Sequence, residues 1–292
     1  MPDRSMVCLG AGFSARHVAA RAIAGGWHVS GTTRAKTGFQ RLIDHGIAPL
    51  VFDGATASPA LGAAIKTASH ILVSIAPDAD APTHTCDPVL THLWPLIRQA
   101  DQLEWIGYLS TVGVYGDHDG NWVDETTVCR PVSKRSIARV AAEQQWLDRA
   151  SAQTQWRLQI FRLSGIYGPG RNPMEKLKAG RSRRIIKPGQ VFNRIHAEDI
   201  ASAVMAGASG AGTHAIYNVT DHEPAPPQDV IAFAAELVGL PVPPDQPFET
   251  AEMTPMARSF YGENKRVSNA RATSDLGLTL IYPTYREGLR GL

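Results

Sequence analysis

The sequence contains few cysteines, little excess charge and no long apolar run. Its three cysteines, Cys8, Cys86 and Cys129, are scattered over 292 residues without a C-x-x-C pair. This set excludes a disulfide framework and predicts a reducing, cytoplasmic compartment. The formal net charge of +2 argues against nucleic acid or an anionic membrane as a partner. No stretch approaches the ~20 apolar residues of a membrane-spanning helix, so we expect no membrane association.

Signals for secretion and for a metal site are also missing. The apolar run Met6–Leu9 leads directly into a glycine turn, which is not the shape of a signal peptide. His84, Cys86 and His92 match no standard zinc spacing, and we interpret them as part of a loop that enters a helix. We therefore expect no bound metal.

A strand pattern, a glycine turn and a helical pattern follow one another at the start of the chain. The turn, residues 10–15, reads GAGFSA, a variant of the dinucleotide-binding fingerprint G-x-G-x-x-G/A. Gly10 allows the tight turn, Gly12 lets the backbone approach a pyrophosphate, and the small Ala15 lets the helix pack on the strand. The first helical residues, Phe13 and Ser14, then face the phosphates. The sequence therefore predicts a bound dinucleotide.

Strand and helix patterns alternate through the first half of the chain. They predict an α/β fold with a doubly wound parallel sheet, the Rossmann arrangement. The expected strands are 7–9, 28–32, 49–52, 71–75, 105–109 and 158–163, and the clearest helices lie near 39–43, after Pro88 and over 136–150. After Leu163, glycine and proline clusters break the pattern and predict a smaller, irregular part over the carboxyl edge of the sheet. We expect a dinucleotide-binding domain at 1–164, to which 195–220 returns, and a substrate-side domain at 165–292.

The end of the second strand indicates which dinucleotide binds. No Asp or Glu occurs between residues 16 and 43, so the acid that usually binds the 2′-hydroxyl of NAD is missing. Arg34, with the Thr33 hydroxyl beside it, can instead pair with the 2′-phosphate of NADP. Such a charge-assisted hydrogen bond contributes roughly 1.5–3 kcal/mol, which predicts that NADP(H) binds ~10- to 100-fold tighter than NAD(H). The alternative is that Arg34 and Lys36 are solvated loop charges.

Further cofactor contacts are expected where the third and fourth strands end. Asp53 can accept a hydrogen bond from the adenine amino group, although a turn acid is an equally good interpretation. Ser74 and Ala76 are small enough to let the cofactor ribose approach the sheet edge.

Four segments, in the expected order, resemble the extended short-chain dehydrogenase/reductase family, which contains nucleotide-sugar epimerases and dehydratases. They read LSTVGVYGD (109–117), RLSGIYGPGR (162–171), RIHAEDIA (194–201) and YNVT (217–220). The resemblance covers nearly the whole chain. It implies that Thr111 hydrogen-bonds the substrate oxygen. It also implies that a Tyr transfers the proton and that a Lys four residues later holds the nicotinamide ribose.

The Tyr-x-x-x-Lys pair is missing at the start of the long helix, where the resemblance places it. Counted back from Glu143, Arg135 stands at the tyrosine position and Arg139 at the lysine position. Arginine stays protonated near neutral pH, so Arg135 cannot donate and accept the proton, whereas Arg139 can still reach ribose hydroxyls. The chain therefore resembles atypical members of the family. Tyr115 is a substitute acid, or else a packing or substrate-side residue.

Other patterns have weaker interpretations. Tyr261 to Lys265 matches Tyr-x-x-x-Lys but lies far beyond the sixth strand, so we interpret it as a chance match or at most as substrate-side residues. The basic residues at 181–187 are either a solvated face or a clamp for the diphosphate of a nucleotide-linked substrate. Arg194 is a second candidate for substrate binding. His196 and Asp199 are interpreted as a structural contact at a helix start.

Two functions are compatible with the sequence. The first is an NADP(H)-dependent oxidoreductase or epimerase for a nucleotide-sugar-like or other small carbonyl or alcohol substrate. Thr111 would polarise the substrate oxygen and Arg139 would hold the ribose. The second is a dinucleotide-binding sensor or interaction protein without turnover. Two long helices that flank the sheet are compatible with a homodimer of the kind found in resembling proteins.

Overall fold

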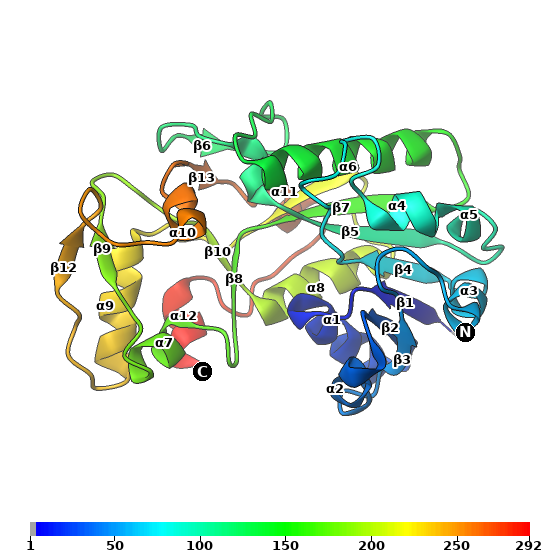
Figure 1. Cartoon of the computed structure of the whole chain (residues 1–292), viewed down its shortest axis with the longest axis horizontal. Coiled ribbons are helices and arrows are strands. Elements are labelled where there is room, and N and C mark those ends of the chain that lie inside the picture. The colour runs from blue at the N-terminus through cyan, green and yellow to red at the C-terminus, as the bar shows by residue number, and fades with distance from the viewer. Residues whose placement is uncertain (1–3) are drawn as a thin grey trace.

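The computed structural model describes residues 4–292, which fold around one parallel sheet (Figure 1). The sheet has seven strands in the order β11-β7-β5-β4-β1-β2-β3. Its strands are β1 (Ser5–Leu9), β2 (His28–Thr33), β3 (Ala48–Val51), β4 (His70–Val73), β5 (Trp105–Thr111), β7 (Arg157–Leu163) and β11 (Ile216–Val219). This confirms the doubly wound α/β fold and each strand expected from the sequence.

Helices cover both faces of the sheet because its strands alternate their side chains between two apolar layers. Met6 and Cys8 pack on one face with α1 and α8, whereas Val7 and Leu9 pack on the other with α3, α4, α5 and α6. The bounds are α1 (Phe13–Ala24), α2 (Phe39–Ile43), α3 (Pro59–Lys66), α4 (Pro88–His92), α5 (Trp94–Ile97), α6 (Lys134–Ser151) and α8 (Ala197–Ala208), with two 3-10 turns, η1 (Lys36–Gly38) and η2 (Val112–Tyr115).

The helix expected after Pro88 is divided into α4 and α5. Asp87 caps α4, since its Oδ1 accepts hydrogen bonds from the Val89 and Leu90 amides at 2.8 and 3.2 Å. Pro95 has no amide hydrogen to donate to the preceding turn, so the helix is interrupted at Leu93 and restarts as α5. The apolar periodicity alone did not show this break.

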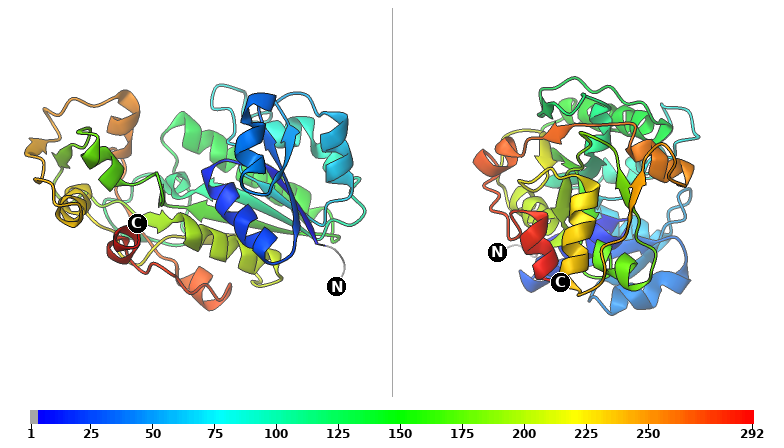
Figure 2. Two further views of the ribbon diagram at one scale, coloured as in Figure 1. Left: turned by 90° about the horizontal axis from the view of Figure 1, so that it is seen from below. Right: turned by 90° about the vertical axis from the view of Figure 1, so that its left-hand side faces the viewer.

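A smaller lobe stands at one end of the sheet (Figures 1 and 2). Its helices are α7 (Pro173–Lys178), α9 (Pro227–Leu237), α10 (Pro255–Phe260) and α12 (Tyr285–Arg290). Short parallel pairs of strands lie outside the seven-stranded sheet: β8 (Gly165–Tyr167) with β10 (Arg194–His196), β9 (Arg184–Ile186) with β12 (Asp245–Pro247), and β6 (Trp122–Val123) with β13 (Arg266–Val267).

The chain returns from this lobe to the sheet. Helix α8 lies against α1, and β11 pairs with β7 over four residues, from Ile216 opposite Ile160 to Val219 opposite Leu163. Helix α11 (Ala270–Ser274) then packs against β11. None of the helices in residues 4–292 is long and apolar enough to cross a lipid bilayer.

Candidate functional site

The glycine turn between β1 and α1 is held by the end of β2. The Gly10 amide donates to the Thr32 hydroxyl at 2.7 Å, and the Ala11 amide donates to the Thr32 carbonyl at 2.9 Å. Gly10 has φ +90°, and a Cβ there would lie 2.8 Å from Ile75 Cγ1 and 3.0 Å from the Ile75 amide nitrogen. Only glycine fits this position. The role of Thr32 was missed at the sequence level, although it directly precedes the predicted Thr33–Arg34 pair.

The beginning of α1 is arranged to receive an anion. Its N-cap residue, Gly12, supplies no side-chain cap, so no side chain satisfies the first amides of the helix. Gly12 is exposed, whereas Ser14 and Ala15 are buried. A pyrophosphate fits here on two grounds: free amides at a helix N-terminus, and a turn too tight for any Cβ at Gly10.

Residues expected at the adenosine lie at the adjacent strand ends. Thr33 ends β2, and the exposed Arg34 follows it. Among residues 4–292, no carboxylate lies within 4.0 Å of the Arg34 guanidinium. Asp53 caps a turn, because its Oδ1 accepts the Ala55 and Thr56 amides, each at 2.9 Å, which lowers the Asp53 pKa. The turn role is therefore present, and the other Asp53 oxygen is left for a ligand.

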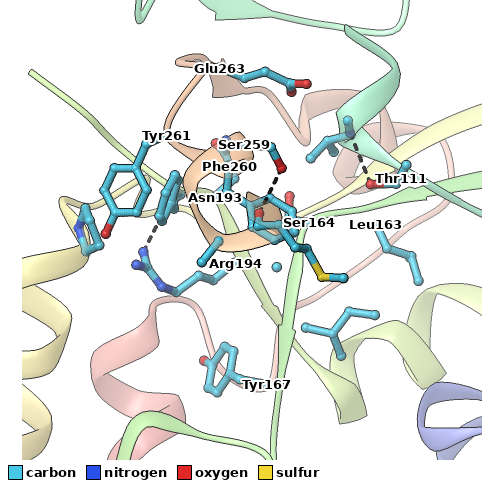
Figure 3. Close-up of a pocket in the computed structure, with 18 of the residues that line it drawn as sticks. Thr111, Leu163, Ser164, Tyr167, Asn193, Arg194, Ser259, Phe260, Tyr261 and Glu263 are labelled. Carbon is cyan, nitrogen blue, oxygen red and sulfur yellow. Dashed lines mark hydrogen bonds between the residues drawn. The ribbon is translucent and has the colours of Figure 1, made fainter. Parts of the chain in front are cut away.

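A cavity of about 2300 Å³ opens at the carboxyl ends of β4, β5 and β7. Pockets for single drug-sized ligands measure roughly 300–1,000 Å³, so this space can hold two molecules. On the cofactor side it is lined by Ser14, Ser74 and Ala76. Across from them, Thr111, Ser164 and Arg194 face the same space (Figure 3). The structure therefore brings part of the predicted cofactor site together with Thr111 and Arg194.

Thr111 ends β5 and stands at the floor of the cavity. Its Oγ1 accepts the Gly113 amide at 3.1 Å, which starts the turn η2. The hydroxyl hydrogen is not used in that contact and is free to point toward a substrate oxygen.

Helix α6 presents basic side chains where the resemblance places Tyr and Lys. Arg135 and Arg139 both line the cavity. Arg139 Nη1 donates to the Tyr108 hydroxyl and the Leu109 carbonyl, each at 2.9 Å, and its guanidinium lies over the Tyr108 ring. These contacts anchor Arg139 to β5. Its Nη2 and Nε have no acceptor among residues 4–292 and stay available for ribose hydroxyls.

The sequence of the chain matches a known family over most of its length. The profile of the NAD dependent epimerase/dehydratase family matches residues 7–220. The chain belongs to this family. Its membership confirms the resemblance drawn from residues 109–220.

The chain is similar to proteins of known structure and to a curated protein matched by sequence. A conserved protein of unknown function from Silicibacter pomeroyi DSS is 48% identical, with a TM-score of 0.88 over 99% of this chain and 98% of that one. The UDP-glucose 4-epimerase of Thermotoga maritima is 17% identical, with a TM-score of 0.77 over 98% and 96% of the two chains. Protein YeeZ of Escherichia coli is 29% identical over 63% of this chain, and the match spans 61% of the length of that curated relative.

Tyr115 does not line the cavity, although the sequence suggested it as a substitute acid. It is fully buried, donates its hydroxyl to Asn218 Oδ1 at 2.7 Å and accepts from Arg162 Nη1 at 3.0 Å. Burial raises the Tyr115 pKa to about 12. The structure thus places Tyr115 in a packing role, one of the two interpretations left open for it.

Tyr115 is part of a buried polar network beneath Thr111. Arg162 Nη2 pairs with Glu143 Oε2 at 2.7 Å, and both side chains are nearly inaccessible to solvent. Ser110 donates to the other oxygen of Glu143. The network joins β5, α6, β7 and β11, so it holds together the part of the sheet that carries Thr111.

The segment 261–265 forms the wall opposite α6. Tyr261, Glu263 and Lys265 all line the cavity (Figure 3 shows the first two). Lys265 is buried, and its Nζ donates to the Gly116 carbonyl and to Glu263 Oε2, both at 2.6 Å. These positions agree with the substrate-side interpretation of the segment.

The remaining sequence patterns, the basic residues at 181–187 and the His196–Asp199 pair, lie at different places in the structure. Arg181 and Arg183 line the cavity, but Arg184 pairs with Asp245 and Lys187 donates to the Tyr261 carbonyl. His196 and Asp199 do not bind each other: His196 accepts the Glu198 amide, and Asp199 accepts the amides of 281 and 282. No group of three metal-binding side chains occurs in the part of the chain that the structure describes.

Proposed function

We propose that the protein is an NADP(H)-dependent oxidoreductase or epimerase that acts on a small carbonyl or alcohol compound in the cavity. The observation that carries this proposal is the single cavity that runs from Ser14 and Ser74 to Thr111 and Arg194. It adjoins the uncapped start of α1 and continues into a polar wall, as a site for a dinucleotide and a substrate requires. The UDP-glucose 4-epimerase fold and the basic cavity residues support a nucleotide-linked substrate as one member of this class.

The proposal divides the chain by task. Residues 1–164, with α8 and β11, would hold the cofactor, and most of 165–292 would form the substrate side. Arg34 would pair with the 2′-phosphate, because the strand end offers a free guanidinium and no acid. Thr33 would add a hydroxyl, and Ser74 and Ala76 would leave room for the ribose.

The chemistry assigned to the chain is limited and specific. The bound dinucleotide would supply or accept a hydride. Thr111 would donate a hydrogen bond to the reacting oxygen, and the free nitrogens of Arg139 would orient ribose hydroxyls. Arg135 stays protonated and therefore acts only as a fixed charge. With Tyr115 buried outside the cavity, water or another proton-bearing group of the cavity would supply the proton of a reduced oxygen.

The cofactor preference is tested by titrating the protein with NADPH and, in parallel, with NADH. We expect NADPH to bind ~10- to 100-fold tighter, and Arg34→Ala to remove most of that difference. Lys36→Ala is the matched control, since Lys36 is also basic and exposed but stands two residues farther on. Equal affinities of the unaltered protein for the two cofactors would contradict the assignment.

Turnover is tested by following NADPH oxidation over a panel of carbonyl compounds. Removal of one preorganised donor lowers kcat by about 10²–10³, so Thr111→Ala should reduce any activity by a factor of that order. Thr111→Ser keeps the hydroxyl and should retain most of the rate. An activity that survives Thr111→Ala undiminished removes Thr111 from the mechanism.

The second candidate is a dinucleotide-binding sensor or interaction protein. Arg135 at the tyrosine position and the packing role of Tyr115 favour it, because both remove the usual proton donor. Tight NADPH binding with no oxidation of NADPH by any compound of the panel would support this candidate over the enzyme.

A further inference from the structure

One end of the cavity, beside β8 and β10, is rich in hydrogen-bond donors. We call Arg194, Ser164, Tyr285 and Tyr261 the Arg194 subsite. All four line the cavity. They come from β10, the end of β7, α12 and the segment after α10, so they meet only in the folded chain. Figure 3 shows the Tyr261 hydroxyl pointing toward the Arg194 guanidinium.

The Arg194 backbone lies opposite a glycine. Gly165 and Arg194 are directly paired in the β8–β10 ladder. A Cβ on Gly165 would lie 3.0 Å from the Asn193 carbonyl and 4.0 Å from Arg194 Cγ. A larger residue at 165 would therefore press on the Asn193 carbonyl that precedes the arginine, while the contact with the Arg194 stem would be an ordinary one.

The Arg194 guanidinium makes no ion pair with the described residues, although the more distant carboxylates of Asp221 and Glu223 act on it by charge. Its Nη1 donates to the Phe192 and Ala225 carbonyls at 2.9 and 3.2 Å. The other two nitrogens have no acceptor within residues 4–292, and no carboxylate of these residues lies within 4.0 Å. Burial lowers the Arg194 pKa, yet an arginine stays charged. A desolvated cation with free donors favours an anionic ligand.

Two hydroxyls of the subsite have no partner either. Ser164 Oγ and Tyr285 Oη are buried and make no hydrogen bond in the described chain, and their residues are only 4% and 1% exposed. A buried hydroxyl without a partner costs about 1–3 kcal/mol. Such groups in a native fold usually have a partner from outside the protein chain, such as an ordered water or a ligand.

We propose that the Arg194 subsite binds a carboxylate of the substrate. A guanidinium offers two parallel donors that match the two oxygens of a carboxylate, and the neighbouring hydroxyls add donors without adding charge. The single positive charge of the Arg194 guanidinium balances the single negative charge of a carboxylate. A phosphate dianion would be balanced better nearer Arg171, Lys176 and Arg181, which line another part of the cavity. The inference rests on the proposed function only in assuming that a substrate enters this cavity.

The test measures binding of 4-fluorobenzoate to the full chain by fluorine NMR, with and without NADPH. The neutral, equally sized 4-fluorobenzamide is the matched probe. We expect the acid to bind with a Kd in the millimolar range, about −4 kcal/mol, and the amide to bind at least tenfold more weakly. Arg194→Met should weaken the acid at least tenfold. Arg181→Met is the control for an arginine in the same cavity outside the subsite and should change the Kd less than twofold.

Two further variants keep the Arg194 charge. They test the subsite even if the Arg194→Met protein fails to fold. Ser164→Ala and Tyr285→Phe each remove one unpartnered hydroxyl, and each should weaken the acid about three- to tenfold while the amide is unaffected. If both variants bind the acid as the unaltered protein does, the hydroxyls serve only a structural water and the proposal is wrong.

Other results would also overturn the inference. They are an absence of binding to the unaltered protein at about 20 mM acid, a Kd that does not depend on Arg194, or phenyl phosphate binding tighter than the acid through Arg194. These outcomes differ from a failure of the proposed function. A protein that binds the acid at Arg194 but not NADPH would retain the subsite and lose the oxidoreductase assignment.

Discussion

The cofactor turn and the opposite wall of the cavity are held together by contacts of very different range. At the turn, Gly10 is bound by Thr32, 22 positions away and on the neighbouring strand. At the wall, Lys265 binds the Gly116 carbonyl across 149 positions. The first arrangement follows from one β-α-β unit. The second requires segments from distant parts of the chain to be folded together.

The largest effect is expected from breaking the buried polar network that joins β5, α6, β7 and β11. Arg162→Met would leave the Glu143 carboxylate buried without its cation, which typically costs about 3–5 kcal/mol. The free energy of unfolding in urea measures this loss. A loss that stays under about 1 kcal/mol would show that the Glu143–Arg162 pair contributes little to stability.

A double variant separates the charge from the packing. Arg162→Met combined with Glu143→Leu removes both charges and should restore more than half of the lost free energy, because apolar pairs can replace buried ion pairs. If the double variant is as unstable as the single one, packing rather than the unpaired charge accounts for the loss.

The next effect concerns the local turn. Gly10→Ala places a Cβ against Ile75 at a positive φ, which should cost ~1–3 kcal/mol of stability and weaken NADPH binding at least tenfold. Gly12→Ala is the matched change, because Gly12 has φ −77° and its nearest neighbour to a new Cβ, the Gly10 carbonyl oxygen, lies 4.0 Å away.

Gly12→Ala should lower stability by no more than about 1 kcal/mol, the usual cost of alanine at an N-cap, yet still weaken NADPH binding at least tenfold. Urea unfolding and NADPH titration check the two quantities separately. Full NADPH affinity in Gly12→Ala would show that no pyrophosphate approaches this turn.

The last prediction is a pH dependence through Asp221, which follows β11. Burial raises the pKa of Asp221 to about 8, and Arg194 opposes that rise while Glu223 and Asp199 add to it. In the unfolded chain the group ionises near pH 4. The folded state therefore loses stability through Asp221 as the pH rises from about 4 to 8.

Asp221→Asn removes this titration. The Tm of the variant minus the Tm of the unaltered protein should be larger at pH 8.5 than at pH 5.5. Each kcal/mol of stability that the variant gains corresponds to ~2–4 °C in Tm. Thermal unfolding at the two pH values measures it. A difference that is the same at both values would show that Asp221 is ionised throughout this range.

Much of the fold could be predicted because its signals are local. The glycines, the apolar runs and the position of Thr111 each lie within a short segment, and the structure places them as the sequence indicated. Three features were missed for different reasons. Thr32 was overlooked beside Thr33, the interruption at Leu93 was hidden by a continuous apolar period, and the Glu143–Arg162 pair joins residues on separate elements.

The sequence by itself determined the Rossmann sheet and the turn for a dinucleotide, because strand periodicity and a glycine at positive φ act over a few residues. Only the tertiary structure decided where side chains from distant segments point. It buried Tyr115 against Arg162 and Asn218, brought segment 261–265 to the cavity, and placed Ser164 and Tyr285, with their unpartnered hydroxyls, in the lining of the same cavity as Arg194. The physical reason is that these contacts cross sheets and helices separated by many residues, and no local propensity encodes them.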